Sequence, residues 1–195
     1  MFQLTSDQAA TIRDRFVPDQ PGLLLGLHVL QTGNGACFVE TWPNPRAVLV
    51  DCAGNYSLTG DPEALQPDDL KDRVTGVLDT SERFLPLLRA AFPEMIVWDR
   101  LILALETPPR CSVPPDHPVR RLTPADTQYL DRLCEEVIWV GKTWGGPSGL
   151  AGSGTAWGAF AEDRLVSVAC TFCVGDRYED IGIATEPEFR GLGFG

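Results

Sequence analysis

A proline-dense segment at residues 107–118 constrains the architecture of this chain more than any other feature. Its sequence is TPPRCSVPPDHP. Proline fixes the backbone angle φ and has no N–H to donate, so this segment cannot continue a helix or a central strand. We therefore predict an N-terminal α+β domain at 1–106, a semi-rigid linker at 107–118 and a second domain at 119–195. A chain of 195 residues is long enough for two small domains.

The first domain is predicted to mix helices and strands. Thr5 and Gln8 have the spacing of a capping box, which predicts a helix that continues to Phe16. The turn signal at 32–35 predicts a hairpin between the apolar run Leu23–Leu30 and a returning strand. The remaining expectations are strands at 36–40, 47–52 and 95–105 and helices at 68–74 and 80–92.

The second domain is predicted to open with a short strand and a helix and to continue as a meander. Thr123 has the character of an N-cap, with Pro124 at the first helical position, and apolar residues follow at helical spacing to Ile138. A further helical turn is expected within the glycine-rich segment 141–154. Short turns then join three strands into an antiparallel meander, so the chain as a whole belongs to the α+β class. The expected strands are 119–122, 155–161, 165–173 and 178–184.

The last residues of the sequence form a strand followed by a glycine-rich loop. The strand ends at Thr185, Pro187 prevents its extension, and the pattern Arg190-Gly191-x-Gly193-x-Gly195 follows. Alternating glycines let successive backbone N–H groups approach an anion without obstruction by Cβ atoms, and an arginine adds positive charge. A glycine-rich turn that binds no ligand is the alternative, because such short patterns also arise by chance.

This segment resembles the acetyl-CoA pyrophosphate loop of GNAT-type N-acetyltransferases. The wider sequence resembles a bacterial branch of that superfamily that carries an additional N-terminal domain. The resemblance implies the N-terminal half of a GNAT fold, with a mixed, mainly antiparallel sheet. It further implies that the end of the last strand contacts the pantetheine arm and that the loop holds the pyrophosphate. The cofactor-binding residues implied are Ile183, Ala184, Thr185, Arg190, Gly191, Leu192, Gly193, Phe194 and Gly195.

A complete GNAT domain continues beyond this loop with a helix, a splayed strand and further elements. By this resemblance the sequence is interpreted as C-terminally incomplete, either as a fragment or as a truncated gene product. The missing part usually supplies a tyrosine general acid and half of the cofactor cleft.

Glu179 is the candidate general base. By the period of a strand it shares a face with Ile181 and Ile183, and GNAT enzymes often carry a catalytic carboxylate on this strand. Asp180 on the opposite face is the alternative base. A third interpretation is that Glu179 is a surface or ion-paired carboxylate without a catalytic role.

We accordingly expect an N-acetyltransferase that transfers the acetyl group of acetyl-CoA, by direct attack, to a primary amine of a small-molecule acceptor. A non-catalytic module that binds CoA, or serves regulation or interaction on a degenerate GNAT fold, is the alternative. Homodimerisation through the N-terminal domain is a further hypothesis.

Charge, hydropathy and cysteine pattern limit the partners. The net charge of −11 argues against nucleic acid and anionic membranes as partners and suits an amine substrate. With no signal peptide or membrane span evident, a cytoplasmic location is expected. The pair Cys170 and Cys173 lies on a predicted strand, where residues three apart face opposite sides, so we expect buried free thiols and no metal site.

Overall fold

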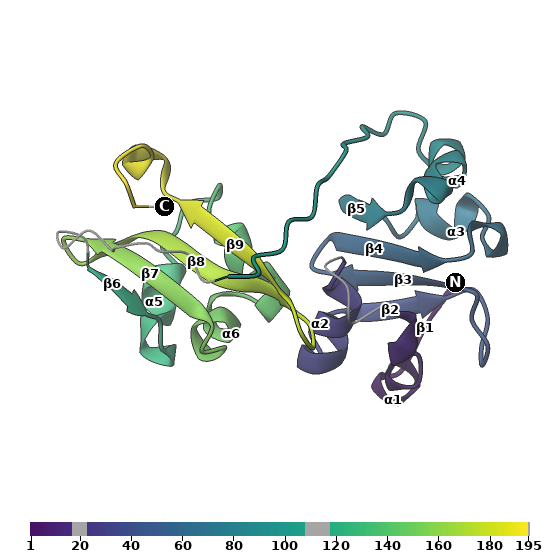
Figure 1. Cartoon of the computed structure of the whole chain (residues 1–195), viewed down its shortest axis with the longest axis horizontal. Coiled ribbons are helices and arrows are strands. Elements are labelled where there is room, and N and C mark those ends of the chain that lie inside the picture. The colour runs from purple at the N-terminus through teal and green to yellow at the C-terminus, as the bar shows by residue number, and fades with distance from the viewer. Residues whose placement is uncertain (17–22, 108–117, 195) are drawn as a thin grey trace. The chain divides into compact units, whose positions relative to one another are not determined.

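The computed structural model describes residues 1–16, 23–107 and 118–194, and these residues form two compact units (Figure 1). The first comprises Met1–Ala104 together with Val174–Tyr178, and the second comprises Leu105–Cys173 together with Glu179–Gly195. Most of the proline-dense segment, residues 108–117, lies outside the described residues.

The first unit is built on a five-stranded sheet in the order β1-β2-β3-β4-β5. The first four strands are antiparallel neighbours, whereas β5 pairs with β4 in parallel. The tight turn between β3 and β4 has positive φ at both Ala53 and Gly54, which matches the twist of a two-residue hairpin. The strands are β1 (Phe2–Gln3), β2 (Ala36–Val39), β3 (Ala47–Cys52), β4 (Asn55–Gly60) and β5 (Val77–Thr80).

Helices cover this sheet and bury its central strand. Every residue of β3 except Asp51 is buried, which explains its nearly continuous apolar sequence. Phe84 and Leu88 from the α4 region pack with Leu49 and Leu58 of the sheet in one core cluster. The predicted capping box is confirmed, because the Thr5 and Gln8 side chains each bond the other residue's backbone N–H. The α-helices are α1 (Ser6–Ala10), α2 (Leu25–Thr32), α3 (Asp68–Lys71) and α4 (Leu85–Ala91), with short 3₁₀ helices at Arg13–Arg15, Pro62–Ala64 and Glu82–Phe84.

The predicted strand at Leu23–Leu30 is wrong, because this run forms helix α2. An apolar run without clear periodicity does not distinguish a buried strand from a buried helix. Here residues 25–29 are all buried, and Gly33 ends the helix in a left-handed conformation with φ +73°. The turn signal at 32–35 is therefore a helix C-cap followed by a loop, and the predicted hairpin does not form.

The predicted strand at 95–105 is also absent, although its sequence is typical of a strand. The residues Met95–Leu105 contain no helix or strand, and most of their apolar side chains are exposed. A strand is stabilised by the hydrogen-bonded ladder to a neighbour, and this segment has no neighbouring ladder within the described residues.

The second unit is built on a four-stranded sheet in the order β6-β7-β8-β9. Strand β7 is antiparallel to both β6 and β8. Glu162 and Asp163 form the β7–β8 turn, both with positive φ. The predicted meander is confirmed, with β9 at the edge of the sheet. The strands are β6 (Val119–Arg121), β7 (Ala156–Ala161), β8 (Arg164–Val174) and β9 (Glu179–Thr185).

Short helices pack against this sheet through a core that includes Leu130, Val140, Leu150 and Val168. The helix predicted to continue to Ile138 is shorter, since α5 spans Thr127–Leu130 after a 3₁₀ turn at Pro124–Asp126. A longer 3₁₀ helix at Ile138–Trp144 follows, and α6 at Pro147–Gly152 confirms the helical turn expected in the glycine-rich segment.

A buried carboxylate fixes the start of this helical region. The carboxylate of Asp126 accepts hydrogen bonds from the backbone N–H and the hydroxyl of Thr123. It also accepts two hydrogen bonds, of 2.7 and 2.9 Å, from the guanidinium of Arg120. The hydrogen bonds from Arg120 hold the pKa of Asp126 well below its usual range. The expected capping signal at Thr123 is therefore present and is reinforced by an ion pair.

The described cysteines are free thiols. Cys170 and Cys173 are both buried, as are Cys37 and Cys52, while Cys134 is partly buried. Burial raises the pKa of Cys170 to about 12, which keeps its thiol protonated and unreactive. In the part of the chain that the structure covers, no group of side chains has the arrangement of a metal site, and no helix is long and apolar enough to cross a membrane.

Candidate functional site

Strand β9 presents one apolar face outward. Ile181 and Ile183 are 66% and 53% exposed, whereas Gly182 between them is buried. A Cβ atom at Gly182 would lie 3.3 Å from the Cβ of Phe172 and 3.5 Å from the Sγ of Cys170, so the inward side is closely packed. Glu179 is exposed at the start of the same strand. The predicted grouping of Glu179 with the two isoleucines on an accessible face is therefore present.

A buried glutamate anchors the loop where β9 ends. Glu186 is only 3% exposed, and its Oε1 accepts a hydrogen bond of 2.8 Å from the backbone N–H of Cys134. Its Oε2 lies 3.3 Å from the Arg164 guanidinium, and its backbone N–H donates to the carbonyl of Val166. These contacts tie the start of the loop to the α5 side of the unit and to β8.

Arg164 extends this anchor into the loop. Its guanidinium bridges Glu186 and Glu188 and lies over the ring of Phe189, 5.3 Å from the ring centroid. Phe189 in turn meets Phe194 edge to face, with ring centroids 5.7 Å apart. The two ends of the described loop are thus held together by an aromatic pair, which an arginine covers on one side.

Arg190 also contributes to the conformation of the loop. Its Nε donates a hydrogen bond of 3.0 Å to the carbonyl oxygen of Thr185, and a terminal nitrogen lies 2.9 Å from Glu136. The side chain remains about half exposed. Arg190 therefore connects the end of β9, the loop and the region after α5, and it still presents a cation at the surface.

The glycines of the loop leave its backbone open. Gly191 and Gly193 have φ values of +77° and +85°, which residues with a Cβ atom rarely adopt. A Cβ atom built on either glycine would meet nothing within 4 Å. The space beside both residues is therefore accessible to a ligand. Open glycines beside a partly exposed guanidinium fit the phosphate groups of a nucleotide-type cofactor. Gly195, the last predicted member of the loop, lies outside the described residues.

Glu179 lies at the opposite end of β9. Its carboxylate accepts a hydrogen bond from the hydroxyl of Thr171, a buried residue of β8. Thr185 follows Glu179 by six positions, which corresponds to about 20 Å along a strand. A ligand that reaches both the loop and Glu179 must therefore be long and extended.

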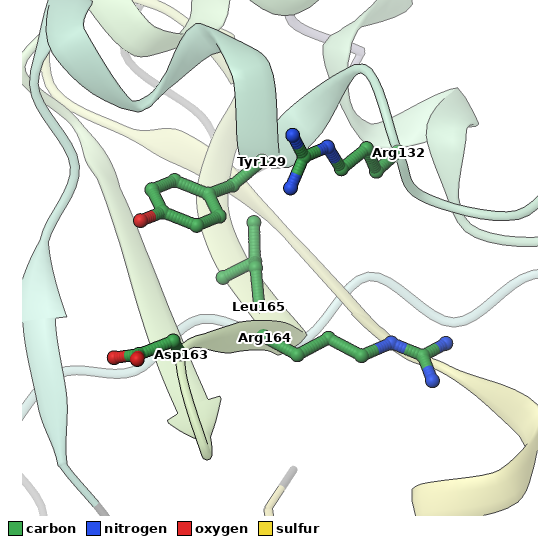
Figure 2. A pocket seen from close by; sticks show the side chains of 5 residues that line it. All are labelled: Tyr129, Arg132, Asp163, Arg164 and Leu165. Carbon is green, nitrogen blue, oxygen red and sulfur yellow. The ribbon is translucent and has the colours of Figure 1, made fainter.

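Two shallow hollows lie beside the start of β8, near the anchored end of the loop. The first has a volume of about 240 Å³ and is lined by Tyr129, Arg132, Asp163, Arg164 and Leu165. Figure 2 shows Leu165 pointing toward the Tyr129 ring, while the Arg164 side chain extends away from Asp163. The second shares Asp163 and Arg164 and adds Phe189 of the loop. Leu165 is six residues from Thr171 along β8, or about 20 Å, so these hollows do not surround Glu179.

Comparison with known proteins identifies the family. No family model matches the chain. A GCN5-related N-acetyltransferase-like protein from Streptococcus suis has a similar structure, with a TM-score of 0.72 and 14% identity over 97% of this chain and 80% of that one. An uncharacterized N-acetyltransferase encoded in the mutA 5′ region of Streptomyces virginiae is 38% identical over 178 residues, which is 90% of this chain and 75% of that protein. This chain belongs to the GNAT superfamily of N-acetyltransferases.

Several residues that hold the loop after β9 or the side chain of Glu179 in place were not predicted from the sequence. No sequence pattern predicted a functional role for Glu186, Arg164, Glu136 or Thr171. The burial of Glu186 could not be predicted from its place between a strand and Pro187, because an acidic residue there is normally exposed. The other contacts join residues far apart in the sequence, such as Glu136 and Arg190, and no local pattern indicates them.

Proposed function

We propose that this GNAT N-acetyltransferase uses acetyl-CoA as its donor and acetylates a primary amine of a small molecule. The observation that carries the proposal is the loop after β9, where open glycines of positive φ adjoin Arg190 on a firmly anchored backbone. Such a loop is suited to the pyrophosphate of CoA, because backbone N–H groups and a guanidinium both favour oxygen anions.

The exposed face of β9 supports a long donor rather than a compact one. Ile181 and Ile183 lie between the loop and Glu179 and offer apolar surface to an extended arm. Bound at the loop, acetyl-CoA would supply the reactive thioester. The chain's own contribution is to fix the phosphates at Gly191 and Gly193 and to direct the arm along β9.

Glu179 is the proposed general base. The hydrogen bond from Thr171 restricts the position of its carboxylate and satisfies one of its oxygen atoms. An amine must lose a proton as its nitrogen becomes an amide, and Glu179 would accept that proton directly or through a water molecule. The net charge of −11 further favours cationic amines near the protein surface.

Thermal unfolding of the full-length protein with and without acetyl-CoA tests the donor. Acetyl-CoA at about 100 times its Kd should add about 2.7 kcal/mol of stability. Arg190→Ala should lose most of that gain, because Arg190 both supplies charge and connects the loop to Thr185. Absence of stabilisation in the unaltered full-length protein would refute acetyl-CoA as the donor.

Release of free CoA thiol with a panel of amines tests catalysis. Turnover with small primary amines is expected. Stabilisation by acetyl-CoA without turnover on any amine would instead support the alternative of a non-catalytic CoA-binding module.

A further inference from the structure

The segment 95–104 of the first unit is the most apolar exposed stretch of the described chain. Its sequence is MIVWDRLILA. Ile96, Trp98, Leu101 and Leu103 are each more than 70% exposed. Exposed apolar surface on this scale is typical of an interaction site rather than of a solvated loop.

The amino-acid composition of the segment is typical of a β-strand, but no neighbouring strand pairs with it in the described residues. β-branched, aromatic and other large apolar residues dominate it, yet it has no regular secondary structure. It lies beside the edge of the sheet, because Arg100 donates two hydrogen bonds of 2.7 and 2.8 Å to the carboxylate of Asp79 on β5. Strand β5 is the last strand of its sheet. A strand-like segment is thus attached at its centre to an edge strand.

The charges of the segment indicate what can pair with it. Asp99 and Arg100 occupy its exact middle, with apolar residues on both sides. If the segment lies antiparallel to the same segment of a second copy, with residue numbers that sum to 199, Asp99 of each copy faces Arg100 of the other. The other opposed pairs are then all apolar: Trp98 with Leu101, Val97 with Ile102, Ile96 with Leu103 and Met95 with Ala104.

Other registers of the two strands are less stable. A shift by one residue places Asp99 opposite Asp99, or Arg100 opposite Arg100, and a parallel in-register pair does both. Like charges directly opposite each other destabilise a pair of strands, whereas opposite charges stabilise it. The sequence therefore selects one register, and this register has the two-fold symmetry of a homodimer.

We propose that this chain forms a homodimer in which residues 95–104 of two copies pair as antiparallel strands around a central Asp99–Arg100 contact. In the dimer the exposed apolar side chains contact one another across the strand pair, and each copy supplies the hydrogen-bonded neighbour that the segment lacks. Arg100 keeps its contact with Asp79, which restrains the centre of the segment before association and so lowers the ordering cost. This dimer would form whether or not the chain transfers acetyl groups.

Complementary charge reversals test the register. Asp99→Arg places two arginines opposite each other in every homodimer, and Arg100→Asp places two aspartates there. Each variant alone should dimerise at least about tenfold more weakly than the unaltered protein in sedimentation equilibrium. An equimolar mixture of the two variants should form a heterodimer, because both central pairs are then of opposite charge. Misfolding of either variant would not produce this recovery.

Asp72→Arg is the matched control, since it makes the same charge change at an exposed position after α3. It should leave dimerisation unchanged. Hydrogen exchange should show that every second amide within 96–103 gains protection as protein concentration rises, because alternate residues of an antiparallel pair donate across it. A monomeric full-length protein, a dimer insensitive to both reversals, or protection of the segment in the monomer would each overturn the proposal. The last result would show that another part of the same chain covers the segment.

Discussion

The two ends of strand β9 differ in how firmly the protein holds them. At the Thr185 end, the buried carboxylate of Glu186, the Arg164 bridge and the Phe189–Phe194 pair fix the loop. At the other end, Glu179 is exposed and has a single described side-chain contact, with Thr171. The rigid end corresponds to the proposed phosphate site, and the open end to the proposed reaction site.

This difference has a physical rationale. A donor that every reaction shares is best bound by a preorganised loop, because ordering the loop on binding would cost affinity. An exposed base lets an acceptor amine enter and exchange its proton with water. The two ends should therefore respond differently to substitution, one in stability and donor affinity and the other in turnover.

Glu179→Gln should have the largest effect, and the effect should be confined to catalysis. A general base contributes roughly 100-fold or more to a rate, so the turnover number should fall by about that factor. Stability and acetyl-CoA affinity should be unchanged, because Thr171 can donate to an amide oxygen as it does to the carboxylate. Steady-state kinetics measures the turnover number, calorimetric titration the affinity for acetyl-CoA and urea unfolding the stability. Asp180→Asn is the matched control, and a larger loss of turnover there would transfer the base to Asp180.

Glu186→Ala should act mainly on stability. The substitution leaves the backbone N–H of Cys134 buried and removes a carboxylate from beside Arg164, which should cost about 2 kcal/mol or more. Urea unfolding measures this loss. Glu188→Ala is the comparison, since it removes the exposed partner of the same arginine and should cost at most about 1 kcal/mol. Equal costs would show that the burial of Glu186 is not what anchors the loop.

Gly191→Ala should separate backbone strain from ligand binding. Alanine at positive φ should cost about 1 kcal/mol of stability, and its Cβ would occupy the space proposed for phosphate, which should weaken acetyl-CoA binding about tenfold or more. Gly154→Ala is the matched control, because Gly154 has a φ of +72° and equally open surroundings away from the loop. It should lose similar stability and no donor affinity. Equal loss of affinity in both variants would contradict a phosphate site at Gly191.

The meander that leads to the loop could be predicted from sequence because its signals are local. Turn residues at 162–164 and 175–176 separate apolar runs of strand length, and Thr123 marks a helix start by its own spacing. The GNAT resemblance then followed from a contiguous motif. These features depend on neighbours in the sequence, so no knowledge of packing was needed.

Two failures in the first unit arose because the deciding contacts are distant. The sequence of the run at 23–30 is compatible with a buried strand or a buried helix. It forms a helix whose residues 25–29 are all buried by neighbouring elements. The run at 95–105 has strand composition but no adjacent ladder in the described sheet. In the site, the role of Glu186 depends on Cys134 and Arg164, which lie 52 and 22 residues away.

Glu136→Gln should have the smallest effect, and its direction is informative. The ion pair between Glu136 and Arg190 is exposed on both sides, so its loss should change stability by at most about 0.5 kcal/mol. Glu136 nevertheless competes with phosphate for the guanidinium, and neutralising it raises the positive potential at the loop. Acetyl-CoA affinity should therefore rise about twofold, and the increase should diminish at high salt. A fall in affinity as large as that of Arg190→Ala would instead show that this surface ion pair, rather than the buried Glu186 anchor, sets the loop's binding conformation.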